Sequence, residues 1–152
     1  MAKTSSFSKI VQQWMDTFMH RSMRGWIQFV KSTGLSMPQF SILMQLYHKG
    51  ACGMSELSEG FGITPAAASQ LVEKLVQADL IARTENPHDR RAKQVALTLQ
   101  GKQLIEQGIE ERYRWMEKLE TGLSDSEKGK ISEALEILIR EVESLEIPSA
   151  HK

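Results

Sequence analysis

The sequence of 152 residues contains a single cysteine, four prolines and no long hydrophobic run. One cysteine excludes a disulfide bond within the chain and a zinc site built from four cysteines. No apolar stretch approaches the roughly 18 residues that a membrane-spanning helix requires. The N-terminus also lacks the long apolar region of a signal peptide. We therefore expect a cytoplasmic protein with no membrane partner.

Neither sign of charge dominates, because 19 basic residues balance 19 acidic ones. This balance argues against a polybasic nucleic-acid binder, yet it allows basic residues to be gathered in one place, since the phosphate backbone responds to the local field. Catalytic motifs are missing: there is no glycine-rich phosphate loop, nucleophile elbow or HExxH. His48 and Cys52 are four positions apart, but the turn at Gly50 interrupts the helical spacing that would bring them together as a pair of metal ligands. We expect no catalysis, no metal and no cofactor.

The hydrophobic pattern predicts one domain that is mainly α-helical with a small β-hairpin. Capping boxes at Ser36 and Ser124, and Thr64 followed by Pro65, mark three helix starts. The expected helices span about 7–31, 37–48, 54–60, 65–77, 99–121 and 125–145, and the expected strands span 80–84 and 94–98, with a long charged tip at 85–93. Two short helices around a glycine-bearing turn, followed by a β-ribbon, predict a winged helix-turn-helix.

The middle of the chain resembles the MarR family of bacterial transcriptional regulators, and within it the SlyA-like members. The residues that carry the resemblance are Leu35 to Phe40, Ser55-Glu56-Leu57, Ile63 to Leu75, Leu80-Ile81-Ala82-Arg83, Asn86 to Lys93, and Val95 to Thr98 with Gly101. Two positions depart from the family pattern. Asp79 stands where the family usually has a glycine turn, and Gly53 stands where Thr or Ser commonly caps the short helix.

The resemblance implies three regions: an N-terminal dimerisation helix at 1–34, a winged helix-turn-helix at 35–101, and C-terminal dimerisation helices at 102–152. A homodimer would place two recognition helices on successive major-groove faces, so the operator in double-stranded DNA should be a pseudo-palindrome. The implied function is a transcriptional regulator, expected to be a repressor, whose DNA binding a small molecule modulates.

The helix after Thr64 is the expected recognition helix. Glutamine bonds bidentately to adenine, serine reaches a base or a phosphate, and alanine methyls suit thymine methyls. The expected DNA-binding residues of this helix are Thr64, Ala66, Ala67, Ser69, Gln70 and Lys74. On the hairpin, the resemblance implies that Arg91 enters a minor groove and is oriented by Asp89, while Arg90 and Lys93 contact phosphates.

An effector site is harder to place from sequence. In the family, small aromatic or phenolic ligands bind between the dimer helices and the winged core. The residues expected to line such a pocket are Trp14, Phe18, Met23, Trp26 and Met44, with His20 and Phe40 beside them, although a stripe of Met and aromatic residues at helical spacing more often belongs to a core. The alternatives are a winged-helix module for protein interaction, architectural DNA binding, and a redox regulator that acts through Cys52.

Overall fold

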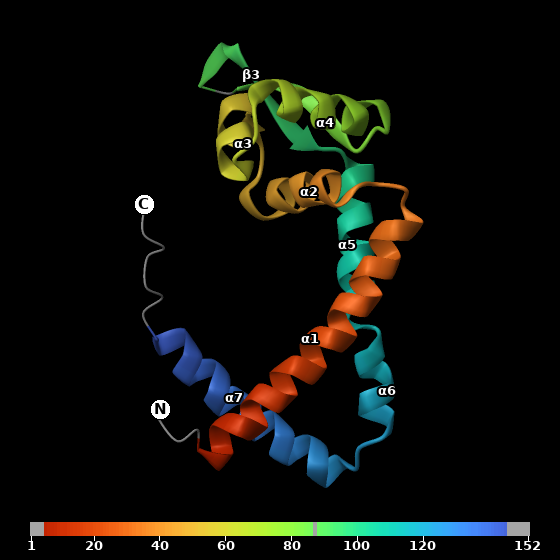
Figure 1. The fold of residues 1–152 in the computed structure, drawn as a ribbon, viewed down its shortest axis with the longest axis vertical. Coiled ribbons are helices and arrows are strands. Elements are labelled where there is room, and N and C mark those ends of the chain that lie inside the picture. Colours follow the sequence, from red (N-terminus) through yellow and green to blue (C-terminus); the bar gives the residue numbers. More distant parts are fainter. Residues whose placement is uncertain (1–4, 87, 146–152) are drawn as a thin grey trace. The chain divides into compact units, whose positions relative to one another are not determined.

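The computed structural model describes residues 5–86 and 88–145, with the backbone alone for residues 89–92. The elements are α1 (Ser6–Ser32), α2 (Met37–Lys49), β1 (Cys52–Gly53), α3 (Met54–Phe61), α4 (Pro65–Gln77), β2 (Ile81–Asn86), β3 (Asp89–Leu97), α5 (Leu99–Tyr113), α6 (Trp115–Thr121) and α7 (Asp125–Ser144) (Figure 1). They group into two compact units, of which one ends at Arg114 and the other begins at Trp115. Within the described residues, no helix is both long enough and apolar enough to cross a membrane.

The predicted helix starts are confirmed by their capping hydrogen bonds. The Ser36 hydroxyl accepts from the Gln39 N–H at 3.4 Å, and the Gln39 side chain accepts from the Ser36 N–H at 2.9 Å. Thr64 caps α4, with Pro65 in its first turn. As the departure at Gly53 predicts, α3 has no side-chain hydrogen bond at its N-cap. Local sequence therefore sets where these helices begin.

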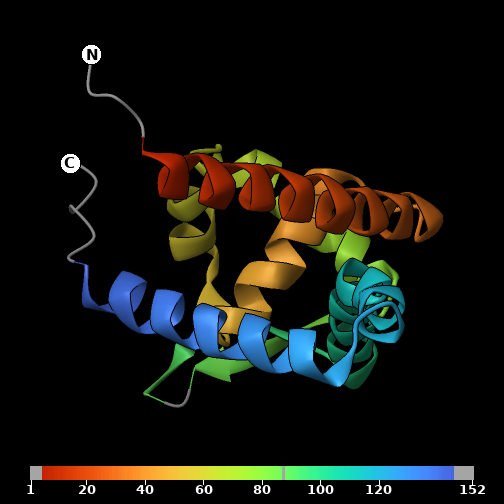
Figure 2. The ribbon, with the colours of Figure 1, turned by 90° about the horizontal axis from the view of Figure 1, so that it is seen from below.

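The core of the first unit is formed by the C-terminal half of α1, by α2, α3, α4 and α5, and by the sheet. Phe40, Leu43 and Leu57 are fully buried there. Helix α1 is one unbroken helix (Figure 2), and its buried residues lie in its C-terminal half, which runs alongside α5 (Figure 1). A Cβ atom at Gly25 would lie 2.7 Å from the carbonyl oxygen of Glu111. Glycine is therefore required for the observed approach of α1 to α5.

The sheet has three antiparallel strands in the order β1-β3-β2. Strand β1, in which Cys52 pairs with Val95, was not predicted, because a two-residue strand has no periodicity to recognise. The long polar tip expected at 85–93 is wrong: β2 continues to Asn86 and β3 begins at Asp89. Backbone pairing between the strands extends into this polar segment, which residue type alone did not indicate.

The junction of α4, β2 and α5 depends on two unusual backbone positions. Asp79 has φ 57°, a left-handed conformation that usually belongs to glycine. The Thr98 hydroxyl donates to the Asp79 carbonyl at 2.6 Å, and the Thr98 N–H donates to the Leu80 carbonyl at 3.1 Å. At Gly101, a Cβ atom would overlap that same Leu80 carbonyl oxygen. The start of α5 therefore packs directly onto the start of β2.

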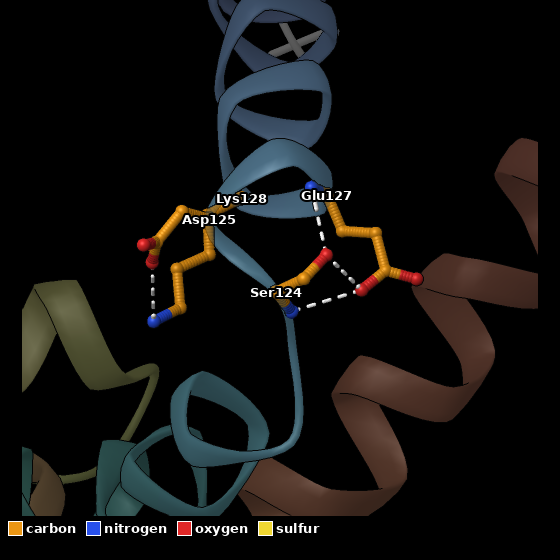
Figure 3. A network of polar contacts seen from close by, with 4 residues as sticks. All are labelled: Ser124, Asp125, Glu127 and Lys128. Carbon is orange, nitrogen blue, oxygen red and sulfur yellow. Dashed lines mark hydrogen bonds and ion pairs between the residues drawn. The ribbon is translucent and has the colours of Figure 1, made fainter.

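The second unit contains α6 and α7. The single helix expected over 99–121 is wrong, because the structure ends α5 at Tyr113 and begins α6 at Trp115. At the start of α7, the Ser124 N–H and hydroxyl donate to the Glu127 carboxylate at 2.9 and 2.7 Å (Figure 3). These hydrogen bonds lower the pKa of Glu127. The predicted capping box is confirmed.

The two units divide the chain differently from the three predicted regions. Helices α1 and α5 pack with the winged core, whereas no residue in the α6 and α7 ranges is buried. The assignment of the terminal helices to dimerisation therefore stays a prediction.

Candidate nucleic-acid interface

Helix α4 separates a buried face from a polar exposed face. Ala68, Val72 and Leu75 pack into the core. The residues three and four positions apart on the other side, Ala66, Ser69, Gln70, Glu73 and Lys74, are exposed, and Ala67 is half-buried between the two faces. Among the described residues, Ser69, Gln70 and Lys74 form no side-chain hydrogen bond or ion pair. Their donors and acceptors are therefore available to another molecule.

The N-terminus of α4 offers fewer free amides than its sequence suggests. The Ala67 N–H donates to the Thr64 hydroxyl at 3.2 Å, and the Ala68 N–H donates to the Thr64 carbonyl at 3.0 Å. Pro65 has no N–H. In this first turn the Ala66 amide remains for an anion such as a phosphate. The Thr64 hydroxyl oxygen therefore already accepts a capping hydrogen bond, but the hydroxyl proton can still be donated to another molecule.

An ion pair that sequence reasoning missed connects α4 to the hairpin. The Arg83 guanidinium on β2 donates to the Glu73 carboxylate at 3.0 Å, and both side chains are about half exposed. Such an exposed pair contributes only about 0–1 kcal/mol to stability. The pair does neutralise Glu73, the carboxylate on the exposed face of α4. Lys74 is then the charged residue of this face that has no ion pair among the described residues. The pair joins residues ten positions apart across two elements, so no local pattern could reveal it.

The hairpin carries the predicted wing residues on an irregular part of its ladder. Lys93 is exposed and pairs in register with Glu85, and the next pair is Asn86 with Asp89. Residues 90–92 consequently have no partner in register on β2, and a bulge of this kind redirects the side chains of its strand. The structure places the backbones of Asp89, Arg90 and Arg91 in β3, and their side chains lie outside the described residues.

The turn of the hairpin begins with a local hydrogen bond. The His88 N–H donates to the Asn86 side-chain oxygen at 2.9 Å, which is the pattern of an Asx turn. In Figure 1 the paired strands reach past α3 at the edge of the first unit. The hairpin and the polar face of α4 belong to the same compact unit, and the Glu73–Arg83 ion pair links them.

The residues expected to line an effector pocket fall into two groups. Trp26 is buried, with its ring edge-on to Phe40 at 4.8 Å, and Met23 and Met44 pack against the same core. Trp14 and Phe18 lie nearer the N-terminus of α1, with ring centroids 6.1 Å apart. The structure therefore brings Trp26, Met23 and Met44 into the core, and Trp14 and Phe18 into a separate aromatic contact.

An apolar pocket that the sequence did not indicate lies beside α4. It has a volume of about 330 Å³, within the usual range for a small-molecule site. Its lining residues are Met37, Pro38, Ser41, Ile42, Phe61, Ile63 and Leu71. Because Leu71 belongs to α4, a molecule bound there would touch this helix directly.

Cys52 is held in an environment that disfavours redox chemistry. The residue is 5% exposed on β1. Burial raises the pKa of its thiol, the Glu56 carboxylate raises it further, and Lys49 opposes them. Since the thiolate is the reactive form, a buried thiol with a raised pKa reacts slowly. Among the described residues, no group of His, Cys, Asp and Glu could hold a metal ion.

Comparisons with known proteins agree with this architecture. The model of the MarR family matches residues 35–93. YdgJ, an HTH-type transcriptional regulator of Bacillus subtilis, is 27% identical over 120 residues, which are 79% of this chain and 73% of YdgJ. The transcriptional regulator Tm0710 of Thermotoga maritima superposes with a TM-score of 0.75 at 28% identity, over 90% of this chain and 94% of that one.

A further match shares the fold. A mutant of MepR from Staphylococcus aureus, bound to an oligodeoxyribonucleotide, has a TM-score of 0.66 at 21% identity, over 87% of this chain and 97% of that one. The family match lies on the helix-turn-helix and the hairpin, where the residues that carry the sequence resemblance lie. The winged helix-turn-helix of this chain, over residues 35–93, matches the MarR family, and the proteins that the chain resembles are transcriptional regulators rather than enzymes.

Proposed function

We propose that this protein is a homodimeric, sequence-specific DNA-binding regulator that acts in the cytoplasm. It binds a pseudo-palindromic operator in double-stranded DNA and represses transcription, and a small aromatic or phenolic effector releases it. The observation that carries the proposal is the exposed polar face of α4, on which Ser69, Gln70 and Lys74 have no partner among the described residues.

In this proposal the first half of α4 enters a major groove. Gln70 bonds to an adenine edge, Ser69 and Lys74 bond to a base or a phosphate, and the methyl groups of Ala66 and Ala67 contact thymine methyls. Thr64 keeps the N-terminus of α4 in place, and the Ala66 amide holds a phosphate. Base contacts of this kind supply sequence preference, whereas phosphate contacts supply position and affinity.

The hairpin completes the DNA contact at the adjacent minor groove. Arg91 enters the groove with Asp89 as its orienting carboxylate, and Arg90 and Lys93 bind phosphates. The absence of register partners for residues 90–92 supports this role, because a strand that does not follow the ladder there can present its arginines to a groove.

Exposed apolar side chains on the terminal helices support the homodimer. On α1, Phe7 and Ile10 are 63% and 65% exposed, and on α7 Val142 is 62% exposed. Large apolar patches of this kind mark interaction sites, and a two-fold dimer buries the same patch on both copies. Dimerisation would set the spacing of the two α4 helices, and an effector would act by favouring dimers whose spacing does not match successive grooves.

The test is a paired substitution on α4. Gln70→Ala removes the proposed base contact, so we expect preference at one base pair in each half-site to be relaxed and affinity for the preferred site to fall by about 1–3 kcal/mol. The matched control is Gln77→Ala, because Gln77 is exposed and lies two helical turns further along the same side of α4. Operator affinity is measured by fluorescence anisotropy at one fixed salt concentration.

Each outcome bears on the proposal. A relaxed consensus in the Gln70 variant with an unchanged consensus in the Gln77 variant supports direct readout by the first half of α4. Equal behaviour of both variants and the parent protein would contradict the role of Gln70. Binding of no DNA sequence above background would contradict the proposed function itself.

A further inference from the structure

Charge is segregated along a chain whose net charge is zero. Residues 17–55, which include the C-terminal half of α1, contain no Asp or Glu. Helix α7 has the opposite bias, with six acidic residues against three basic ones. A neutral protein with this distribution carries two surfaces of opposite sign, one in each compact unit.

The basic surface is a defined stripe on α1. Arg24, Ile27 and Lys31 follow one another at intervals of three and four residues, so they lie on one side of the helix. They line a hollow of about 450 Å³ together with His20, Met23 and Gln28. Ile27 is 40% exposed in the middle of the stripe, which we name the basic stripe.

The acidic surface on α7 repeats this arrangement with the opposite charge. Glu136, Ile139 and Glu143 have the same intervals of three and four residues, and Ile139 is 55% exposed between the two carboxylates. We name these three residues the acidic stripe. Arg140 is the basic residue nearest to it, and its guanidinium donates to the Glu141 carboxylate at 3.3 Å.

Neither stripe has a partner within the described part of the chain. Arg24, Lys31, Glu136 and Glu143 are exposed and form no ion pair there. Each stripe therefore leaves a large apolar side chain and two unpaired charges in water. Burying the two isoleucines against each other would remove apolar surface from water, and the flanking charges would pair in the same contact.

We propose that the basic stripe of α1 receives the acidic stripe of α7 from a second copy of this chain. The inference rests on the proposed homodimer and adds its pairing rule: Ile27 packs against the partner copy's equivalent of Ile139, with Arg24 and Lys31 facing carboxylates. Two-fold symmetry makes the contact twice in each dimer. Like charges would meet in a pairing of α1 with α1 or of α7 with α7 through these stripes, so the charges also exclude wrong pairings.

The test uses two charge-reversed variants and their mixture. One variant carries Arg24→Glu and Lys31→Glu, and the other carries Glu136→Lys and Glu143→Lys. Each alone faces like charges in both contacts of a dimer, and we expect its dimer dissociation constant to rise at least about tenfold in 0.1 M salt. When the two are mixed, both contacts again join opposite charges. Sedimentation equilibrium should then show mixed dimers with a dissociation constant near that of the parent protein.

The mixture separates a contact between copies from one within a chain. If each stripe met its counterpart in the same chain, mixing would restore nothing, and the inference would be overturned. The control Glu141→Lys reverses one charge in the same sense on another side of α7, and it should leave dimerisation unchanged. Both double variants change exposed side chains alone, and circular dichroism is used to check that each is folded.

Two further results complete the test. The loss in each variant should shrink in 0.5 M salt, because the screening length falls well below the value of about 10 Å at 0.1 M. A parent protein that stays monomeric at every concentration contradicts the homodimer of the proposed function. A parent dimer whose variants dimerise equally well contradicts the pairing of the two stripes and leaves the homodimer standing.

Discussion

Replacing Gly101 with alanine should destabilise the first unit strongly, although alanine is the better helix former. Gly101 lies in the first turn of α5, where a Cβ atom would overlap the Leu80 carbonyl oxygen and lie 3.0 Å from the Leu80 carbonyl carbon. The atom would also lie 3.1 Å from the Cδ2 of Leu97. Because the obstacle is backbone that already accepts a hydrogen bond from the Thr98 N–H, a side-chain rotation cannot relieve it.

The magnitude follows from two opposing contributions. Alanine gains up to about 1 kcal/mol over glycine inside a helix. Overpacking costs typically about 1–3 kcal/mol and more where backbone must move, so the steric cost here should be at the upper end or beyond. We expect a net loss of at least about 2 kcal/mol, which for a chain of this size lowers the Tm by roughly 4–8 °C.

Thermal unfolding at one fixed protein concentration measures this effect, since the Tm of a dimer depends on concentration. The matched control is Gly60→Ala in α3, where the nearest atoms to a Cβ are side-chain atoms of Gln45 at 3.5 Å, an ordinary contact. That variant should be unchanged or slightly more stable. A Gly101→Ala protein as stable as the Gly60→Ala protein would refute the argued close packing of α5 against β2.

Two other predictions concern the hairpin and the cysteine. Arg91→Ala should weaken operator binding by at least about 1 kcal/mol and reduce the salt slope by roughly one unit, and an unchanged affinity and slope would remove the hairpin from the proposed interface. Because the pKa of Cys52 is raised in the folded state, its contribution to stability is complete below the ordinary thiol pKa and is lost as the pH rises through the raised value. Between pH 8 and 10, the free energy of unfolding measured in denaturant should therefore fall more steeply with pH for the parent protein than for Cys52→Ala. An equal pH dependence of the two proteins would contradict a buried thiol with a raised pKa.

Local signals predicted much of the fold from the sequence. The pairs Ser36 with Gln39 and Ser124 with Glu127, and Thr64 before Pro65, place helix starts because each is a contact between residues at most three positions apart. The winged helix-turn-helix, which the structure confirms, was predictable for the same reason, since each of its helices carries its own apolar period. The nearer likeness to SlyA-like members stays a prediction.

Contacts between distant residues were not predictable in this way. The pairing of Cys52 with Val95 in β1 joins residues far apart in sequence, and the Glu73–Arg83 ion pair depends on how α4 meets β2. The same limit applies to the effector residues, because a Met and aromatic pattern does not distinguish Trp26 in the core from Trp14 further along α1. The DNA-binding residues of α4 stay predictions, although the structure places them on its exposed side or at its N-terminus.

Selection of binding sites from random duplex DNA is the first experiment to make, because it measures sequence-specific DNA binding by a dimer. Affinities for the selected sites are then measured at two salt concentrations. We expect an enriched pseudo-palindrome, with half-sites about one helical turn apart and binding that weakens steeply as salt rises. Selection that enriches no sequence, with only weak binding of any duplex, would contradict the proposed sequence-specific binding.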